Sequence, residues 1–209
     1  MEITVDKNKY EFIDLLNKIN RPGADINALI YKLSSSDFFI APCSTKNHLA
    51  CVGGLCQHSL NVYRTLVKLN EEFKFGLSDE TMIVIGLLHD IAKMDKFEQY
   101  YRNVQKYSEN GKKSDENGRY DWVKEWAYKL KEDNNRFVFG HHGQNSEYIA
   151  NSYIPLTTEE SAAIVNQMSG ATEEYKPYDA SAILAKYKSV VALHMADFLC
   201  TFYLDRVDE

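Results

Sequence analysis

Residues 78–93 read SDETMIVIGLLHDIAK, an apolar block that leads into a histidine and an aspartate. Ser78 and the acidic residues after it predict a helix start, because a serine side chain caps the first backbone N–H groups and acidic side chains favour that helix end. Residues 82–88 are apolar on nearly every side of a helix, which predicts a central, buried helix. His89 and Asp90 are costly to bury there unless they are paired or bind a metal ion.

Apolar residues at helical spacing extend this prediction over most of the chain. We expect further helices over residues 6–19, 25–33, 55–73, 144–151, 158–168 and 179–203. The region 97–133 differs, because strand-like residues at 100–104 and 120–123 are separated by Asn-Gly turn signals. The predicted fold is therefore all-α, a helical bundle with a small β-hairpin excursion around residues 98–125. We expect a single domain over residues 1–209, with N-terminal helices in 1–36.

Composition narrows the range of partners. The chain has 209 residues, 44% hydrophobic, with a formal net charge of −6, which is globular composition and excludes a disordered or collagen-like chain. The acidic balance argues against stable binding to a nucleic-acid duplex, so an anionic substrate would need positive charge concentrated by a metal ion or a few basic residues. No leader or long apolar run is visible, and the four cysteines form no CxxC pair. We expect a cytoplasmic protein with reduced thiols and no membrane partner.

Three predicted helices each place ionisable residues among apolar ones. His58 lies early in the helix 55–73, His89 and Asp90 end the apolar helix, and Asp197 interrupts the apolar stretch 190–199. Taken singly, each has an ordinary interpretation as a core histidine, a helix cap or an ion-pair partner. Together they offer imidazole and carboxylate ligands to one divalent cation and would leave positions open for water and substrate.

These residues lie in segments that resemble the HD-domain superfamily of metal-dependent phosphohydrolases, whose signature is His, His-Asp and Asp on a helical bundle. The segments are GGLCQHSLNV at 53–62, GLLHDIAK at 86–93 and ALHMAD at 192–197. The resemblance spans roughly residues 38–204, which would form the metal-binding core. It extends to a phage- and Firmicutes-type branch through YRNV at 101–104 and GHHGQNS at 140–146.

The resemblance implies that His58, His89, Asp90 and Asp197 hold a divalent metal ion. Mn, Fe, Zn, Ni, Co or Mg would suit such ligands, and the sequence does not choose among them. A second metal is not expected, because Gln167 stands where the related branch has a histidine ligand. Gln144 and Asn145 likewise replace a glutamate and a lysine of that branch.

Further residues are expected to act on the substrate. Asp90 would also be catalytic, by orienting the attacking water or accepting its proton. Lys93 would bind a phosphate, although a lysine that complements the helix dipole is the alternative. His141 or His142, at a predicted helix start, would serve as a general acid. Four further residues are expected to contact the substrate, although each could have a structural role instead. They are His48, Lys46, Arg102 and His194.

The sequence therefore predicts a metal-dependent phosphohydrolase that acts on a phosphate ester or anhydride, with a nucleotide as the expected substrate. Two alternatives stay open. One is a phosphodiesterase for cyclic nucleotides or oligonucleotides. The other is a metal-stabilised module that binds a nucleotide without cleaving it, which the replacements Gln144, Asn145 and Gln167 suggest. A homodimer is also open.

Overall fold

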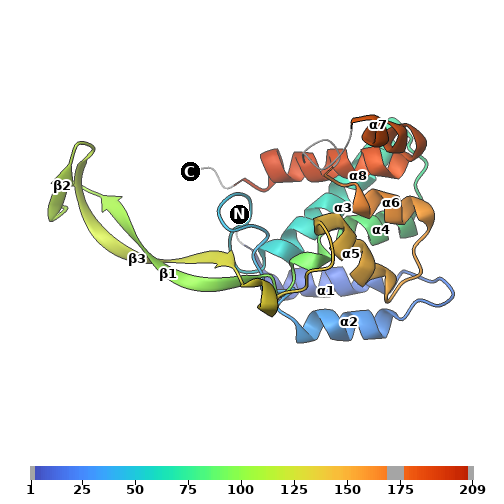
Figure 1. The fold of residues 1–209 in the computed structure, drawn as a ribbon, viewed down its shortest axis with the longest axis horizontal. Coiled ribbons are helices and arrows are strands. Elements are labelled where there is room, and N and C mark those ends of the chain that lie inside the picture. The colour runs from blue at the N-terminus through green and yellow to red at the C-terminus, as the bar shows by residue number, and fades with distance from the viewer. Residues whose placement is uncertain (1–2, 169–176, 207–209) are drawn as a thin grey trace.

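The computed structural model describes residues 3–168 and 177–206, which form a helical body and a long β arm that projects from it (Figure 1). The helices are α1 Val5–Leu16, α2 Ile26–Ser35, α3 Gly54–Phe73, α4 Asp79–Leu88, α5 His142–Asn151, α6 Thr158–Val165, α7 Pro177–Lys186 and α8 Lys188–Leu199. Shorter turns are η1 Ile91–Lys93, η2 Asp133–Asn135 and the π-helical η3 Cys200–Leu204. Within the described part of the chain, no helix has both the length and the apolar character needed to cross a membrane.

The core of the body is built around α3 and α4. The predicted central helix is confirmed, because every residue of α4 from Met82 to Leu88 is buried. Its predicted cap also forms, with Ser78 Oγ accepting a hydrogen bond from the Thr81 N–H at 3.1 Å. Gly86 lets α4 approach α3 closely, since a Cβ atom there would lie 2.9 Å from the Tyr63 Cα. Helices α1, α6 and α8 pack around this pair.

The predicted helix 179–203 is divided in two, which corrects the prediction. Tyr187 has an extended backbone (φ −116°, ψ 109°) and separates α7 from α8. The start of α8 is fixed instead by α6, because the Ser189 N–H donates to Glu159 Oε1 at 3.3 Å and the Ser189 hydroxyl donates to the Glu159 carbonyl at 3.2 Å. Apolar periodicity alone does not reveal such a polar contact between helices.

The β excursion is larger than predicted. Strands β1 Phe97–Tyr107, β2 Lys113–Asp115 and β3 Gly118–Leu130 form an antiparallel sheet in the order β1-β3-β2. The helical bundle is confirmed, but the description all-α with a small hairpin is too narrow, because the ribbon of β1 and β3 continues well beyond the predicted strands. The strand signal is weak there because charged and amide residues alternate with the aromatic ones.

The two faces of the arm differ in chemistry. Cross-strand partners such as Tyr101 and Trp126 share one face. On that same face lie all the exposed large apolar residues of the arm: Tyr101, Tyr107, Trp122, Trp126 and Leu130. The Tyr101 and Trp126 rings stack with their centres 3.7 Å apart. The opposite face carries mainly charged residues, so the arm presents one aromatic side to its surroundings.

Candidate metal centre

The first turn of α3 is shaped to pack against the loop before it. Gly53 has a positive φ of 76°, which favours glycine. A Cβ atom on Gly54 would lie only 2.1 Å from the Leu49 carbonyl oxygen, so only glycine allows this approach. The helix then places His58, which is fully buried, at the centre of the body.

The four predicted ligands lie together. His58 Nε2 is 3.2 Å from Asp197 Oδ1, 3.6 Å from Asp90 Oδ2 and 3.3 Å from His89 Nε2. His89 Nε2 is also 3.6 Å from Asp90 Oδ2. Donor atoms of His58, His89 and Asp90 all lie within 4.8 Å of one another. Helices α3 and α8 and the end of α4 therefore bring imidazole and carboxylate groups to one point.

Both imidazole rings are held in one orientation. His58 Nδ1 donates to Asp205 Oδ2 at 2.6 Å, and the other oxygen of Asp205 accepts from Asn61 Nδ2 at 2.6 Å. His89 Nδ1 donates to the Gly86 carbonyl at 3.0 Å. Each ring therefore turns Nε2 toward the shared point, as in metal sites where a second hydrogen bond fixes the ligand histidine.

Asp205 was not predicted from the sequence. It follows the π-helical turn η3, whose backbone bond from the Asp205 N–H to the Cys200 carbonyl folds it back toward α3. In sequence it is an ordinary aspartate far from His58, and neither spacing nor motif marks it. Only the folded chain shows the contact.

The charges at this point favour a divalent cation. Asp90, Asp197 and Asp205 bring three carboxylates, and Lys93 brings one permanent positive charge. Burial opposes ionisation of Asp197, but the hydrogen bond from His58 lowers its pKa to about 2. Burial lowers the pKa of His89, which favours the neutral, ligating form. Burial lowers the pKa of His58, but the neighbouring acidic groups outweigh burial and raise it well above its ordinary value, so a proton on Nε2 offsets part of their negative charge. A cation that takes the place of this proton leaves neutral imidazoles, three carboxylates and Lys93, and a divalent cation balances the two negative charges that remain.

Asp90 also contacts Lys93 and His142. Lys93 Nζ lies 2.5 Å from Asp90 Oδ2, and His142 Nε2 pairs with Asp90 Oδ1. Although burial raises the pKa of Asp90, Lys93 and His142 hold that pKa well below its ordinary value. Asp90 is therefore an anion shared by the metal ligands, a lysine and a histidine.

The two predicted acid candidates occupy different positions. His142 begins α5 and reaches Asp90, whereas His141 occupies the N-cap of that helix. The His141 N–H donates to Gln144 Oε1 at 3.1 Å. Asn145 Oδ1 accepts from the Gly140 N–H at 2.7 Å, so both replaced positions of this run shape the start of α5.

His194 of α8 and Gln167, just after α6, support the cluster. His194 Nδ1 donates to the Gln167 carbonyl at 2.7 Å, and Gln167 Nε2 donates to the His89 carbonyl at 3.1 Å. Gln167 thus holds the backbone of a predicted ligand.

The remaining predicted contacts divide into near and distant ones. His48 is buried, and its ring lies 5.2 Å from the ring of His58. Lys46 is exposed in the same loop. Arg102 lies on the projecting arm, where its guanidinium is 3.9 Å from Glu125. The structure therefore brings His48, but neither Lys46 nor Arg102, into contact with the cluster.

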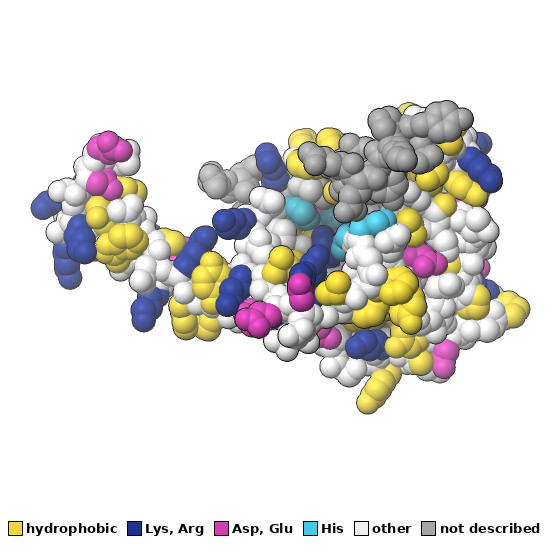
Figure 2. Space-filling model, viewed as in Figure 1, with side chains coloured by type: hydrophobic (Ala, Val, Ile, Leu, Met, Phe, Trp, Pro, Cys, Tyr) yellow, Lys and Arg dark blue, Asp and Glu magenta, His cyan; other side chains and the backbone are white. Residues whose placement is uncertain are grey.

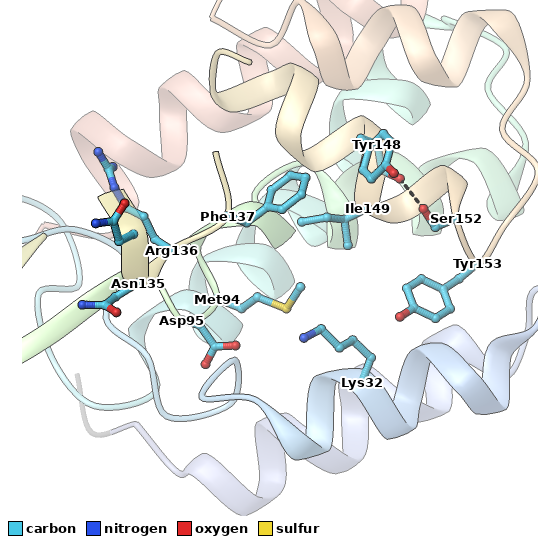
Figure 3. A pocket seen from close by; sticks show the side chains of 11 residues that line it. Lys32, Met94, Asp95, Asn135, Arg136, Phe137, Tyr148, Ile149, Ser152 and Tyr153 are labelled. Carbon is cyan, nitrogen blue, oxygen red and sulfur yellow. Dashed lines mark hydrogen bonds between the residues drawn. The ribbon is translucent and has the colours of Figure 1, made fainter. Parts of the chain in front are cut away.

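A cavity of about 540 Å³ lies outside the cluster (Figure 3). Lys32 of α2, Asp95 and Tyr148 of α5 surround it, and no predicted metal ligand lines it. On the face seen in Figure 2, histidine side chains reach the surface beside basic ones. The side chain of Asp197 is 13% exposed and that of His142 is 23% exposed, so the cluster has its own contact with solvent.

A comparison with known protein families agrees with the resemblance to the HD domain. The sequence profile of the HD domain matches residues 55–187, which include His58, His89 and Asp90 and end before Asp197. No curated protein and no solved structure gave a match.

Proposed function

Because the HD-domain match covers more than half of the chain, the protein belongs to the HD-domain family, and we propose that it is a metal-dependent phosphohydrolase that acts on a nucleotide. The observation that carries the proposal is the convergence of His58, His89, Asp90 and Asp197 at one buried point. The excess of carboxylates there fits a divalent cation, and a cation gives this acidic chain a place to receive phosphate.

The four ligands would hold one divalent ion, and Mn, Fe, Zn, Ni, Co and Mg all remain candidates. When bound, the cation would supply a Lewis acid for a phosphoryl oxygen and lower the pKa of a water molecule. Asp90 would orient the attacking water or accept its proton through Oδ1, because Oδ2 is the oxygen that lies toward His58 and His89. Lys93 would place its ammonium on a phosphate oxygen. Burial opposes that charge, but Asp90 and the other acidic groups nearby together outweigh burial and raise the pKa of Lys93.

His142 would donate a proton to the leaving oxygen, since it is the histidine of α5 that reaches Asp90 and is partly open to solvent. His194 and His48 would lie at the edges of the substrate. Lys46 and Arg102 are left out of this proposal, because Lys46 is exposed and Arg102 lies on the arm. A cytoplasmic location completes the proposal, and all four cysteines are free.

The experiment that tests the proposal is a metal series crossed with a substrate panel. Protein stripped by a chelator is reloaded with each ion and offered nucleoside mono-, di- and triphosphates, cyclic nucleotides and dinucleotides. We expect phosphate release that depends on the added ion. Turnover of cyclic nucleotides or dinucleotides alone would establish the diesterase instead, and tight binding without turnover would establish the sensor.

Asp205→Asn is expected to weaken metal binding by about 10- to 100-fold, because the amide no longer holds His58 Nδ1 as an ionised carboxylate does. Isothermal titration of the stripped protein with Zn²⁺ measures the change. Asp14→Asn, which removes the same charge from an exposed position on α1, is the matched control and should bind as the parent does. Equal affinities for the two variants would remove Asp205 from the metal centre.

We also propose that the chain forms a homodimer through the aromatic face of the arm. Residues 97–130 hold seven Lys or Arg and six Asp or Glu, so their charge is nearly balanced and offers little attraction to phosphate backbones. A two-stranded ribbon with one exposed aromatic face gains stability when that face is covered. A second arm, related by a two-fold axis, presents a face of the same chemistry.

The double variant Trp122→Ser/Trp126→Ser is therefore expected to shift the protein from dimer to monomer in sedimentation equilibrium. Lys106→Ser/Arg119→Ser changes the opposite face of the same strands and should leave the dimer intact. A parent protein that is monomeric at high concentration would contradict the proposal.

A further inference from the structure

The loop before α3 brings a thiol and an imidazole to the metal centre. Cys43 and His48 are both buried. The loop is closed by hydrogen bonds from the Cys43 N–H to the Leu49 carbonyl at 3.1 Å and from the Ser44 hydroxyl to the His48 carbonyl at 2.8 Å. Leu49 has a positive φ of 45°, unusual for a branched residue. The backbone of this short loop is thus held in one conformation that presents both side chains inward.

Two groups of potential ligands share one residue. Donor atoms of Cys43, His48 and His58 lie within 4.8 Å of one another, as do those of His58, His89 and Asp90. His58 has only Nε2 to offer a cation, because its Nδ1 donates to Asp205. A cation bound at that nitrogen would therefore be next to donors from both groups.

Two further observations point to a cation beside Cys43. His48 Nδ1 is buried and has no hydrogen-bond partner in the described part of the chain, while His48 Nε2 lies 3.3 Å from Cys43 Sγ. Such unpaired buried nitrogens are rare in folded proteins. Lys93 Nζ lies 3.6 Å from Cys43 Sγ and 2.5 Å from Asp90 Oδ2, so one side chain links the thiol to the predicted ligand Asp90.

We propose that Cys43 and His48 form a second group of ligands for a cation at His58, the residue that both groups share, which rests on the proposed function above, and that this group makes the site selective for a thiophilic divalent ion such as Zn²⁺ over Mg²⁺. The Cys43 thiol binds as a thiolate, so its S–H bond breaks, a sulfur–metal bond forms and the proton leaves to solvent. Thiolate and imidazole favour zinc and cobalt, whereas magnesium prefers oxygen ligands and water.

Cobalt spectroscopy of the stripped full chain tests this assignment without any measurement of activity. The visible d–d bands of Co²⁺ report binding, and a near-ultraviolet charge-transfer band reports a thiolate ligand. We expect both in the parent protein. Cys43→Ser should lose the charge-transfer band and keep the d–d bands. Cys51→Ser, which changes an exposed cysteine between the same loop and α3, should keep both.

Zinc affinity gives a second measurement. Cys43→Ser and His48→Ala are each expected to lower the affinity for Zn²⁺ by about tenfold or more, with little change for Mg²⁺. If cobalt binds to the parent protein with d–d bands and no charge-transfer band, the thiolate ligand is overturned and the proposed metal centre stands. If cobalt does not bind at all, the proposed function fails together with it.

Discussion

Asp90→Asn is expected to abolish phosphate release and to remove the cation from the purified protein. One oxygen of Asp90 lies 3.6 Å from both His58 Nε2 and His89 Nε2, and the same carboxylate pairs with Lys93 and His142. An amide of the same size keeps the packing but removes the charge that would ligate the cation, orient Lys93 and accept a proton. Loss of a group with several roles costs more than the loss of one donor, so kcat/KM should fall by at least about a thousandfold.

Elemental analysis and a phosphate-release assay measure this change together. Lys93→Met is the informative comparison, because it removes a predicted phosphate contact and leaves every predicted ligand in place. That variant should keep its metal and show a raised KM. Circular dichroism identifies a variant that has lost its helices. Retained metal and activity within tenfold of the parent in Asp90→Asn would refute the role given to Asp90.

The parts of the centre that sequence could predict are those with a local signal. An apolar helix that ends in His89 and Asp90 is unusual in itself, because burial of ionisable groups is costly without a partner. His58 and Asp197 likewise interrupt helices that periodicity identifies. Such signals need only the residues of one helix, so α4 and its cap were predicted correctly from the sequence.

The missed parts depend on contacts between distant segments. Asp205 reaches His58 only because a π-helical turn folds the chain back, and Cys43 reaches Lys93 only through the closed loop before α3. The break at Tyr187 depends on Glu159 of another helix. The length of the arm was missed for a different reason. Its strands pair with each other and are largely exposed on both faces, so burial does not impose an alternation of apolar and polar residues.

Arg21→Ala is expected to destabilise the protein by about 3–5 kcal/mol, because it leaves a buried charge without its partner. Arg21 follows the first helix and makes two hydrogen bonds to Glu160 of α6, at 2.6 Å and 2.9 Å. The Glu160 side chain is fully buried. It keeps bonds from the Thr81 hydroxyl and the Thr157 N–H, but these neutral donors do not replace a guanidinium. Urea unfolding at neutral pH measures the change.

The chain supplies a comparison in a second arginine–carboxylate pair that is far more exposed. Arg64 also makes two hydrogen bonds to one carboxylate, that of Glu11, both at 2.6 Å. These side chains are 41% and 34% exposed, so solvent screens the pair. Arg64→Ala should therefore cost less than about 1 kcal/mol. Similar losses for the two variants would show that burial is not what makes the Arg21–Glu160 pair important.

The pH dependence of the unfolding free energy shows how the charge of Glu160 contributes to the effect of Arg21→Ala. Burial raises the pKa of Glu160, but the Arg21 hydrogen bond and the other donors outweigh it and lower that pKa below its ordinary value. A carboxylate with a lowered folded-state pKa stabilises the fold fully above its unfolded pKa, about 4.3 for glutamate. That stabilisation is lost as the pH falls through the lowered folded-state pKa. The difference in unfolding free energy between the parent and Arg21→Ala should thus be largest at neutral pH and shrink below about pH 4.3. A difference that stays constant from neutral to strongly acidic pH would mean that Arg21 stabilises α6 through packing and its bond to the Pro155 carbonyl, and not through the charge of Glu160.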